Sequence, residues 1–333
     1  MANAVLSTPV FHNETAAFTY VEARMWPNGP VCPHCDAKAD KIGALNARTK
    51  PSKKNPEGSI RHGLRKCYAC RKEFTVRVGT IFEDSHLPLH LWMQAIHLLS
   101  SSKKGISTRQ IQRLLNCSMK TAWFLTHRIR EIMKPAGGSQ MGGSGKVVEV
   151  DETYFGNLPE YKMGAKRHGR PFRSQKRGPS HKRAILSLVE RGGEARSFYV
   201  ERAELGDVVK IVRENVSKES RLHTDESYLY KTVGREFEDH ETVVHSRKEY
   251  ARGDVTTNTV EGFYSIFKRG MRGVYQHCSE AHLHRYLAEF DFRYSNREKL
   301  GVNDTARTGA MMRNAKGRRL TYGGPRSAQP SLT

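Results

Sequence analysis

Two C-x-x-C pairs, Cys32/Cys35 and Cys67/Cys70, restrict the folding of this chain more than any other feature. Each pair presents two thiols on one tight turn, and two such turns supply the four thiolates that tetrahedral zinc takes. Residues 36–66 separate the pairs, which is longer than the usual spacing of about 15 to 20 residues and indicates a longer hairpin. The strand-like YACRKEFTVRVGT after the second pair favours a zinc ribbon with one structural Zn²⁺. The alternatives are a redox pair or two unrelated motifs.

Basic residues outnumber acidic ones along the chain. There are 56 Lys+Arg and 34 Asp+Glu in 333 residues, for a formal net charge of +22. This excess indicates a polyanionic partner, because neutralising phosphates releases counterions. The longest apolar stretch, residues 89–99, is shorter than the roughly 18 residues of a membrane span, and the N-terminus does not look like a secretory signal. We therefore expect a cytoplasmic protein that binds nucleic acid and does not associate with a membrane.

The segment after the ribbon predicts a helix-turn-helix. Apolar residues recur at helical spacing on both sides of a break at residues 116–118, and Ser118 is placed to cap the second helix. A recognition helix of this kind directs polar side chains into the major groove. An ordinary helical pair with a solvated basic face is the alternative. We expect five residues of the second helix to point outward, His127 and four candidate DNA contacts: Lys120, Thr121, Arg128 and Arg130.

The second half of the chain alternates strand-like and helical segments. The expected strands are 147–156, 183–191, 196–203 and 221–229, with a helix at 207–215 and a helical region at 257–297. Three strands, a helix, another strand and later helices favour an α/β domain of ribonuclease-H-like topology, a mixed sheet flanked by helices.

A basic loop, residues 157–183, separates the first two strands. It holds nine Lys/Arg and one acidic residue, so we expect it to lie along a phosphate backbone. A merely solvated insertion is the alternative. The candidate DNA contacts in the loop are Lys166, Arg167, Arg170, Arg173, Lys176 and Arg177.

Three acidic residues in this basic chain have settings that suit a metal site. Asp151 ends an apolar strand, where a charge is costly unless it coordinates or pairs, and Asp225 repeats that setting. Glu261 lies on a predicted helix, with Lys268 two turns later on the same face and Asn258 one turn before. Three oxygen ligands that converge at a sheet end can hold two Mg²⁺ or Mn²⁺ ions around a scissile phosphate. Taken singly, each acid is equally consistent with a turn cap or an ion pair.

The order of these motifs resembles that of the DDE transposases, and more narrowly that of bacterial insertion-sequence transposases of the ISXO type with an N-terminal zinc ribbon. The resemblance covers roughly residues 14–320. The motifs that carry it are WPNGPVCPHC, ISTRQIQRLL with KTAWFLTHRIR, VEVDETYFG, HTDESY, and NTVEGFYSIFKRGMRGVYQH with HLHRYLAEFDFRYSNR. Gln276 departs from the pattern, where the family has His, and this affects only local DNA contacts.

The resemblance implies an enzyme that binds insertion-sequence ends, cleaves there and joins the 3′-hydroxyls to target DNA. Asp151, Asp225 and Glu261 match the three acids of the family, and Lys268 matches a Lys that contacts DNA near the scissile phosphate. Asn258 and Arg269 are further expected DNA contacts. Some relatives place Asn at the third catalytic position, so Asn258 is the alternative to Glu261 there. Flanking acids are assigned to support or DNA orientation: Glu149, Glu152 and Glu226. His223 and His245 are read as structural.

We accordingly expect a multidomain α+β and α/β protein with five segments. These are an N-terminal helix and zinc ribbon (13–82), a helix-turn-helix domain (83–135), a Gly-rich linker (136–146), a catalytic domain (147–300) and a C-terminal tail (301–333). Enzymes of this kind act on double-stranded DNA as oligomers, so we expect at least a dimer, associated with the nucleoid. The alternatives are a DNA-binding regulator without catalysis and a metal-dependent nuclease of the same fold.

Overall fold

The chain divides into two units, and the C-terminal end of the chain completes the first. In a computed structural model, residues 1–133 and 303–333 form one unit, called here the terminal unit, and residues 134–302 form the central unit. The structure describes residues 4–53, 55–135, 137–157, 164–167, 170–172, 182–200 and 203–321.

The first part of the terminal unit is a small antiparallel sheet preceded by a helix. Helix α1 (Glu14–Met25) begins at Asn13, whose side chain accepts a hydrogen bond from the Ala16 amide. Strand β2 pairs with both β1 and β3, and its last residue is Cys67. The strands are β1 (Ile42–Ala44), β2 (Arg65–Cys67) and β3 (Glu73–Phe74).

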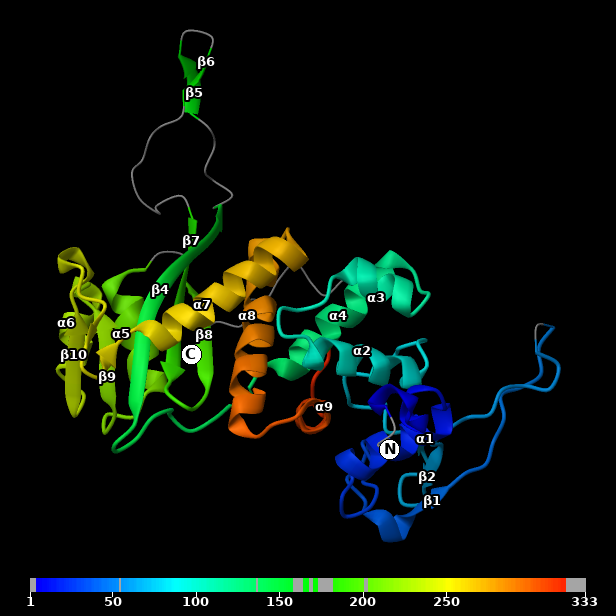
Figure 1. The fold of residues 1–333 in the computed structure, drawn as a ribbon. Coiled ribbons are helices and arrows are strands. Elements are labelled where there is room, and N and C mark those ends of the chain that lie inside the picture. The colour runs from blue at the N-terminus through cyan, green and yellow to red at the C-terminus, as the bar shows by residue number, and fades with distance from the viewer. Residues whose placement is uncertain are drawn as a thin grey trace. The chain divides into compact units, whose positions relative to one another are not determined.

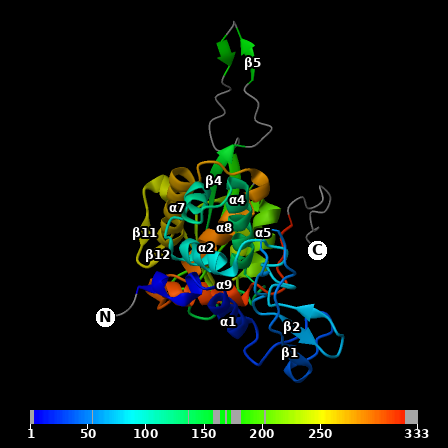
Figure 2. The ribbon, with the colours of Figure 1, turned by 90° about the vertical axis from the view of Figure 1, so that its right-hand side faces the viewer.

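Four helices complete the terminal unit: α2 (Leu89–Ser101), α3 (Thr108–Leu114), α4 (Met119–Met133) and α9 (Asp304–Arg313). Ser107 caps α3 and the Ser118 hydroxyl accepts from the Thr121 amide at the start of α4, as the sequence predicts. Helix α9 lies beside α1 and α2 (Figures 1 and 2), although the whole central unit separates them in sequence. The Thr308 hydroxyl is 3.0 Å from that of Ser100 on α2.

The segment set apart as a C-terminal tail (301–333) therefore begins with a helix that belongs to the terminal unit. Beyond α9, the Ile81 amide donates to the Ala315 carbonyl at 3.0 Å, and Ala315 is fully buried. The sequence DTARTGAMMR does not predict this helix, because the apolar face of the helix is short and its partners lie far away in the sequence. Residues 322–333 lie outside the described part of the chain.

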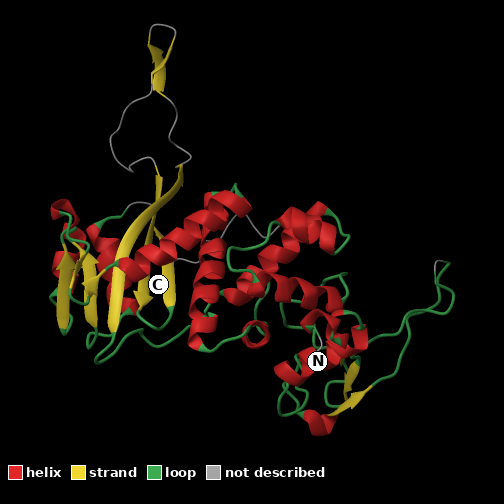
Figure 3. Ribbon diagram, viewed as in Figure 1, coloured by secondary structure: helices red, strands yellow, loops and turns green. Residues whose placement is uncertain are grey.

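The central unit is built on a five-stranded mixed sheet in the order β10-β9-β4-β7-β8 (Figures 1 and 3). Strand β4 pairs antiparallel with β7 and parallel with β9, and β9 pairs parallel with β10. This order confirms the predicted ribonuclease-H-like topology. The strands are β4 (Val147–Asn157), β7 (Lys182–Glu190), β8 (Ala195–Val200), β9 (Arg221–Asp225) and β10 (Asp239–Val243).

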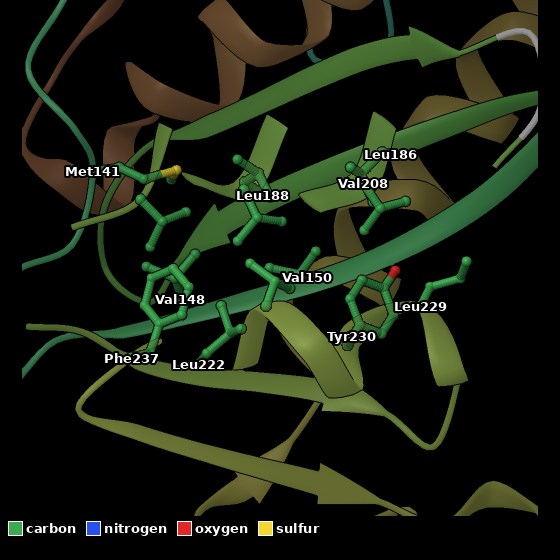
Figure 4. Close-up of a cluster of buried hydrophobic side chains, with 13 residues drawn as sticks. Met141, Val148, Val150, Leu186, Leu188, Val208, Leu222, Leu229, Tyr230 and Phe237 are labelled. Carbon is green, nitrogen blue, oxygen red and sulfur yellow. The ribbon is translucent and has the colours of Figure 1, made fainter. Parts of the chain in front are cut away.

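Helices cover both faces of this sheet. On one face, α5 (Leu205–Asn215) and α6 (Tyr228–Gly234) bury a cluster centred on Val150 and Leu186 (Figure 4). On the other, α7 (Asn258–Gly270) and α8 (Glu280–Ser295) bury a cluster with Ile185 and Val189. Because successive strand residues face opposite sides, β7 contributes to both clusters.

Two further antiparallel strand pairs belong to the described part of the central unit. Strands β11 (Ala251–Arg252) and β12 (Val255–Thr256) pair antiparallel and lead directly into α7. Strands β5 (Gly164–Arg167) and β6 (Arg170–Phe172) pair antiparallel within the predicted basic loop. Among the described residues of both units, no helix has the length and apolar character needed to cross a membrane.

Candidate active site and zinc site

Asp151 and Asp225 lie on neighbouring parallel strands. Strands β4 and β9 pair with Val147 opposite Arg221 and continue in register to Glu149 opposite His223. The same offset sets Asp151 opposite Asp225, two residues beyond the last paired position. The sequence predicts that Asp151 ends its strand, and this is wrong: β4 continues to Asn157 alongside β7. Both carboxylates belong to the sheet face that α7 covers, since Asp151 pairs with Ser187 between two residues of that face.

Glu261 approaches this face from the first turn of α7. One of its oxygens accepts a 3.0 Å hydrogen bond from the Thr257 hydroxyl and lies 3.8 Å from Nε2 of His245. One turn later, the Tyr264 hydroxyl donates to the backbone carbonyl of Asp151 at 2.5 Å. This bond ties α7 to β4 beside the predicted ligand.

The pKa of Asp151 reflects the proximity of the other acids. Burial is the main cause that raises the pKa of Asp151 to about 8. The negative charges of Glu152, Asp225 and Glu261 act in the same direction. Burial also raises the pKa of Asp225, opposed by a hydrogen bond from the Ser227 amide and by the charge of His245. The fold therefore holds several carboxylates where each disfavours the charge of the others.

Lys268 shares the face of α7 that carries Glu261 and Tyr264. Its Nζ lies 5.8 Å from the centroid of the Tyr264 ring. Burial lowers the pKa of Lys268, while the charge of Asp151 opposes that shift. A cation on the same helix face therefore lies within electrostatic reach of the acids, as the helical spacing predicts.

The acid cluster fits a divalent cation by its chemistry. It offers carboxylate oxygens, which Mg²⁺ and Mn²⁺ prefer, and their mutual repulsion is what a bound cation relieves. These oxygens are spread more widely than the ligands of one small ion. Among the described residues, only the four cysteines form a group whose ligand atoms all lie within 4.8 Å of one another. A more widely spaced set of carboxylate oxygens suits two ions about 3.5–4 Å apart.

The four predicted zinc ligands meet at one point of the ribbon. The Sγ atoms of Cys32 and Cys70 are 3.7 Å apart, and those of Cys35 and Cys67 are 3.6 Å apart. Zn–S bonds of about 2.3 Å in a tetrahedron put sulfur atoms roughly 3.8 Å apart, so the cluster has the dimensions of a structural zinc site. Cys32 and Cys67 are fully buried, beside Phe74.

The predicted recognition helix differs from expectation in three of its five outward residues. Lys120 is exposed and Thr121 is partly exposed at the start of α4. His127, Arg128 and Arg130, expected to point outward, are buried, with 1%, 4% and 0% of their surface exposed. Arg128 donates to the Glu83 carbonyl at 2.7 Å and lies over the Trp92 ring. These residues are therefore corrected from outward to buried residues.

The other predicted DNA contacts are only partly described. Asn258 and Arg269 are exposed on α7. The backbones of Lys166, Arg167 and Arg170 form the β5–β6 hairpin. Arg173, Lys176 and Arg177 lie outside the described residues.

Several residues near the acids have clearer roles in the structure than in the sequence. Glu149 is fully buried and bonds to the start of α7, and His245 lies beside Glu261. Glu152 accepts from the Tyr230 hydroxyl on the other face of the sheet, and Glu226 accepts from the Ser246 amide. Arg191, which the sequence analysis missed, bonds to Glu149, and no local motif marks it.

Comparisons with known proteins agree with this arrangement. The family described as the ISXO2-like transposase domain matches residues 142–295, and the transposase zinc-ribbon domain matches residues 12–73. A relative from Halobacterium salinarum, described as an uncharacterized protein in transposable element ISH50, is 26% identical over 303 residues. The match covers 85% of this chain and 91% of the relative.

Proposed function

We propose that this chain, which belongs to the ISXO2-like transposases by its catalytic and zinc-ribbon domains, cleaves DNA at insertion-sequence ends and joins the 3′-hydroxyls to target DNA. The observation that carries the proposal is the placement of Asp151 beside Asp225 on adjacent strands, with Glu261 and Lys268 on one face of the helix that crosses them.

Asp151, Asp225 and Glu261 would hold two Mg²⁺ or Mn²⁺ ions. Bound there, such ions activate an attacking hydroxyl or water and stabilise the departing oxygen. The Thr257 hydroxyl orients the Glu261 carboxylate, and Tyr264 fixes its helix against β4. Lys268 would contact a DNA phosphate next to the scissile bond, where its positive charge also balances the acids.

The two units would divide the work of DNA binding. The terminal unit contains the ribbon and the exposed start of α4, with Lys120 and Thr121, and we assign element-end recognition to it. The basic loop at 157–183, together with Asn258 and Arg269, would bind target DNA through its phosphates. Pairing two element ends requires at least a dimer, which light scattering of the protein on end DNA would detect. A nucleoid-associated protein of the cytoplasm is consistent with this activity.

A strand-transfer assay tests the proposal. Imperfect inverted repeats that flank the gene would supply the end sequence, and the purified protein is incubated with a pre-cut end and a plasmid in Mg²⁺. A covalently joined product is expected. Plasmid fragments without joined product would favour a nuclease of the same fold. Specific end binding with no metal-dependent product would favour a DNA-binding regulator.

A further inference from the structure

Helix α7 begins with only its first amide capped by a nearby side chain: the Thr256 hydroxyl accepts from the Asn258 amide at 2.8 Å, which leaves the next amides, of Thr259 and Val260, without such a cap. The residue before it, Thr257, makes no capping hydrogen bond, and its hydroxyl instead donates to Glu261. The first amides of a helix have no partner within the helix, and Ser, Thr, Asp or Asn at the preceding position usually accepts from them. The start of α7 therefore needs an acceptor from elsewhere.

Glu149 on β4 supplies that acceptor. One of its oxygens accepts from the amides of Thr259 and Val260 at 2.7 and 3.0 Å, and the other accepts from the Thr259 hydroxyl at 2.8 Å. Its side chain is fully buried. Glu149 lies two residues before Asp151 on the same strand face, and Val260 directly precedes Glu261 in the sequence. One carboxylate thus links the strand of the first acid to the helix turn of the third.

Arg191, in the turn after β7, extends the link. Its Nε donates to Glu149 at 2.6 Å, and its two terminal nitrogens donate to the carbonyls of Asp254 and Thr256 at 2.7 and 3.0 Å. Those carbonyls belong to the residue before β12 and to the last residue of β12, the strand that leads into α7. The Arg191 amide also donates to the Val147 carbonyl on β4. The guanidinium fork fixes the approach to α7, while Glu149 fixes its first turn.

A purely stabilising role does not account for this arrangement. A buried ion pair contributes little net stability over well-packed apolar residues, because both charges lose their water. Three bonds to Glu149 instead come from α7, and two bonds from Arg191 end on the hairpin that leads into α7. Glu190, which pairs with Lys146 and bonds to the Gly142 amide, makes a comparable link on β7 without touching α7.

We propose that Glu149, held by Arg191, is a positioning residue that sets Glu261 against Asp151 and thereby sets the affinity of the acid cluster for divalent ions. This inference rests on the proposed function. Residues that orient metal ligands typically change metal affinity or activity by about 10- to 100-fold when replaced.

Glu149→Gln tests the proposal with little change of shape, because the amide keeps one acceptor and turns a donor toward groups that are themselves donors. Mn²⁺ binding is measured by electron paramagnetic resonance on the full-length protein, next to the wild type, Asp151→Asn and the control Glu190→Gln. Glu149→Gln is expected to weaken Mn²⁺ binding at least about tenfold and to raise the metal concentration required for strand transfer, with end binding unchanged. Glu190→Gln is expected to bind Mn²⁺ like the wild type.

Hydrogen exchange without metal gives an independent readout. The Thr259 and Val260 amides are expected to exchange faster in Glu149→Gln, while β4 and α8 keep their protection. If Glu149→Gln fails to fold, Thr259→Val removes only the hydroxyl bond, and its expected loss of Mn²⁺ affinity is about fivefold.

Wild-type Mn²⁺ affinity in Glu149→Gln, or an equal loss in Glu190→Gln, would overturn the positioning role. Failure of the proposed function looks different. In that case the wild type and Asp151→Asn would bind Mn²⁺ alike, whereas the exchange of the Thr259 and Val260 amides would still respond to Glu149→Gln.

Discussion

The cysteine cluster of the terminal unit and the acid cluster of the central unit place metal ligands in opposite ways. Four thiols come from two turns of one small ribbon, with Sγ atoms 3.6 to 3.7 Å apart in the close pairs. Three carboxylates come from β4, β9 and α7 and are spread more widely, and burial, together with the neighbouring negative charges, raises the pKa of Asp151 to about 8. The thiols need a metal ion to complete a small fold, whereas a large fold holds the acids together against their repulsion. A closed site therefore stabilises the protein, and an open site is maintained at a cost in stability.

Removing zinc should have the largest effect on the terminal unit. Structural zinc in small domains contributes about 10–16 kcal/mol, so Cys67→Ser or chelation should unfold the ribbon and abolish end binding while the central sheet persists. Metal analysis should find one zinc per wild-type chain, and hydrogen exchange should locate the loss. Cys117→Ser, outside the cluster, is the control. A folded, end-binding Cys67→Ser protein without zinc would remove the contrast between the two sites.

Truncation after Val302 should have the next largest effect, again on the terminal unit. It removes Met311, Met312 and Ala315, all fully buried, and the bond from Ile81. The expected loss is on the order of 5 kcal/mol, enough to unfold a small domain. A chain ending at Thr321, which keeps α9, should retain the unit. Proteolysis and circular dichroism would distinguish these outcomes, and an intact terminal unit in the shorter chain would contradict the assignment of α9.

Asp151→Asn should have opposite effects on activity and on stability: it should lower strand transfer and raise the stability of the central unit at the upper end of the pH range. Strand transfer should fall about 10³-fold, since a metal ion stabilises the transition state by several kcal/mol. The folded-state pKa of Asp151 lies above the usual 3.8, so the folded protein binds this proton more tightly than the unfolded chain does. Stability without metal should therefore fall as pH rises from 3.8 to about 8, by a few kcal/mol at most.

The measurement is urea unfolding without metal across that pH range. Asp151→Asn should flatten the dependence and be the more stable protein at its upper end. Asp291→Asn is the comparison, because Asp291 is also a buried acid whose pKa burial raises, to about 7, but it bonds to Ser197; this variant should flatten the dependence only up to about pH 7. A wild type whose stability rises through this range would show that the acids do not repel one another.

The smallest expected effects separate the two halves of α4. Arg128→Ala should destabilise the terminal unit by about 2–3 kcal/mol, since it leaves the partly buried Glu83 carbonyl without its partner and removes packing on Trp92. Lys120→Ala should leave stability within about 0.5 kcal/mol and reduce the salt slope of end binding by about 1. Thermal melts and binding isotherms at several salt concentrations would check both. The reverse pattern would restore Arg128 as a DNA contact.

The sequence predicted those parts of the molecule that depend on local spacing. The cysteine pairs gave the ribbon, and helical periodicity put Glu261 and Lys268 on one face of α7. Alternating segments gave the ribonuclease-H-like sheet. In each case the residues that define the feature lie a few positions apart, or follow a strand order with few alternatives.

The sequence could not predict features made by distant partners. His127, Arg128 and Arg130 look like outward residues because nothing near them in sequence shows that the end of α4 is buried. Helix α9 carries too short an apolar face to be recognised alone. The link between Glu149 and α7 depends on strand register and on Arg191, for which the sequence gives no signal.

The most direct test of the acid cluster is strand transfer by Asp151→Asn at DNA concentrations that saturate end binding. The wild type and Asp291→Asn are assayed beside it with a pre-cut end, a plasmid and Mg²⁺. The account predicts equal end binding by all three proteins, joined product from the wild type and Asp291→Asn, and at most about 10⁻³ of the wild-type rate from Asp151→Asn. Joining by Asp151→Asn at the wild-type rate would contradict the assignment of the acid cluster as the catalytic centre.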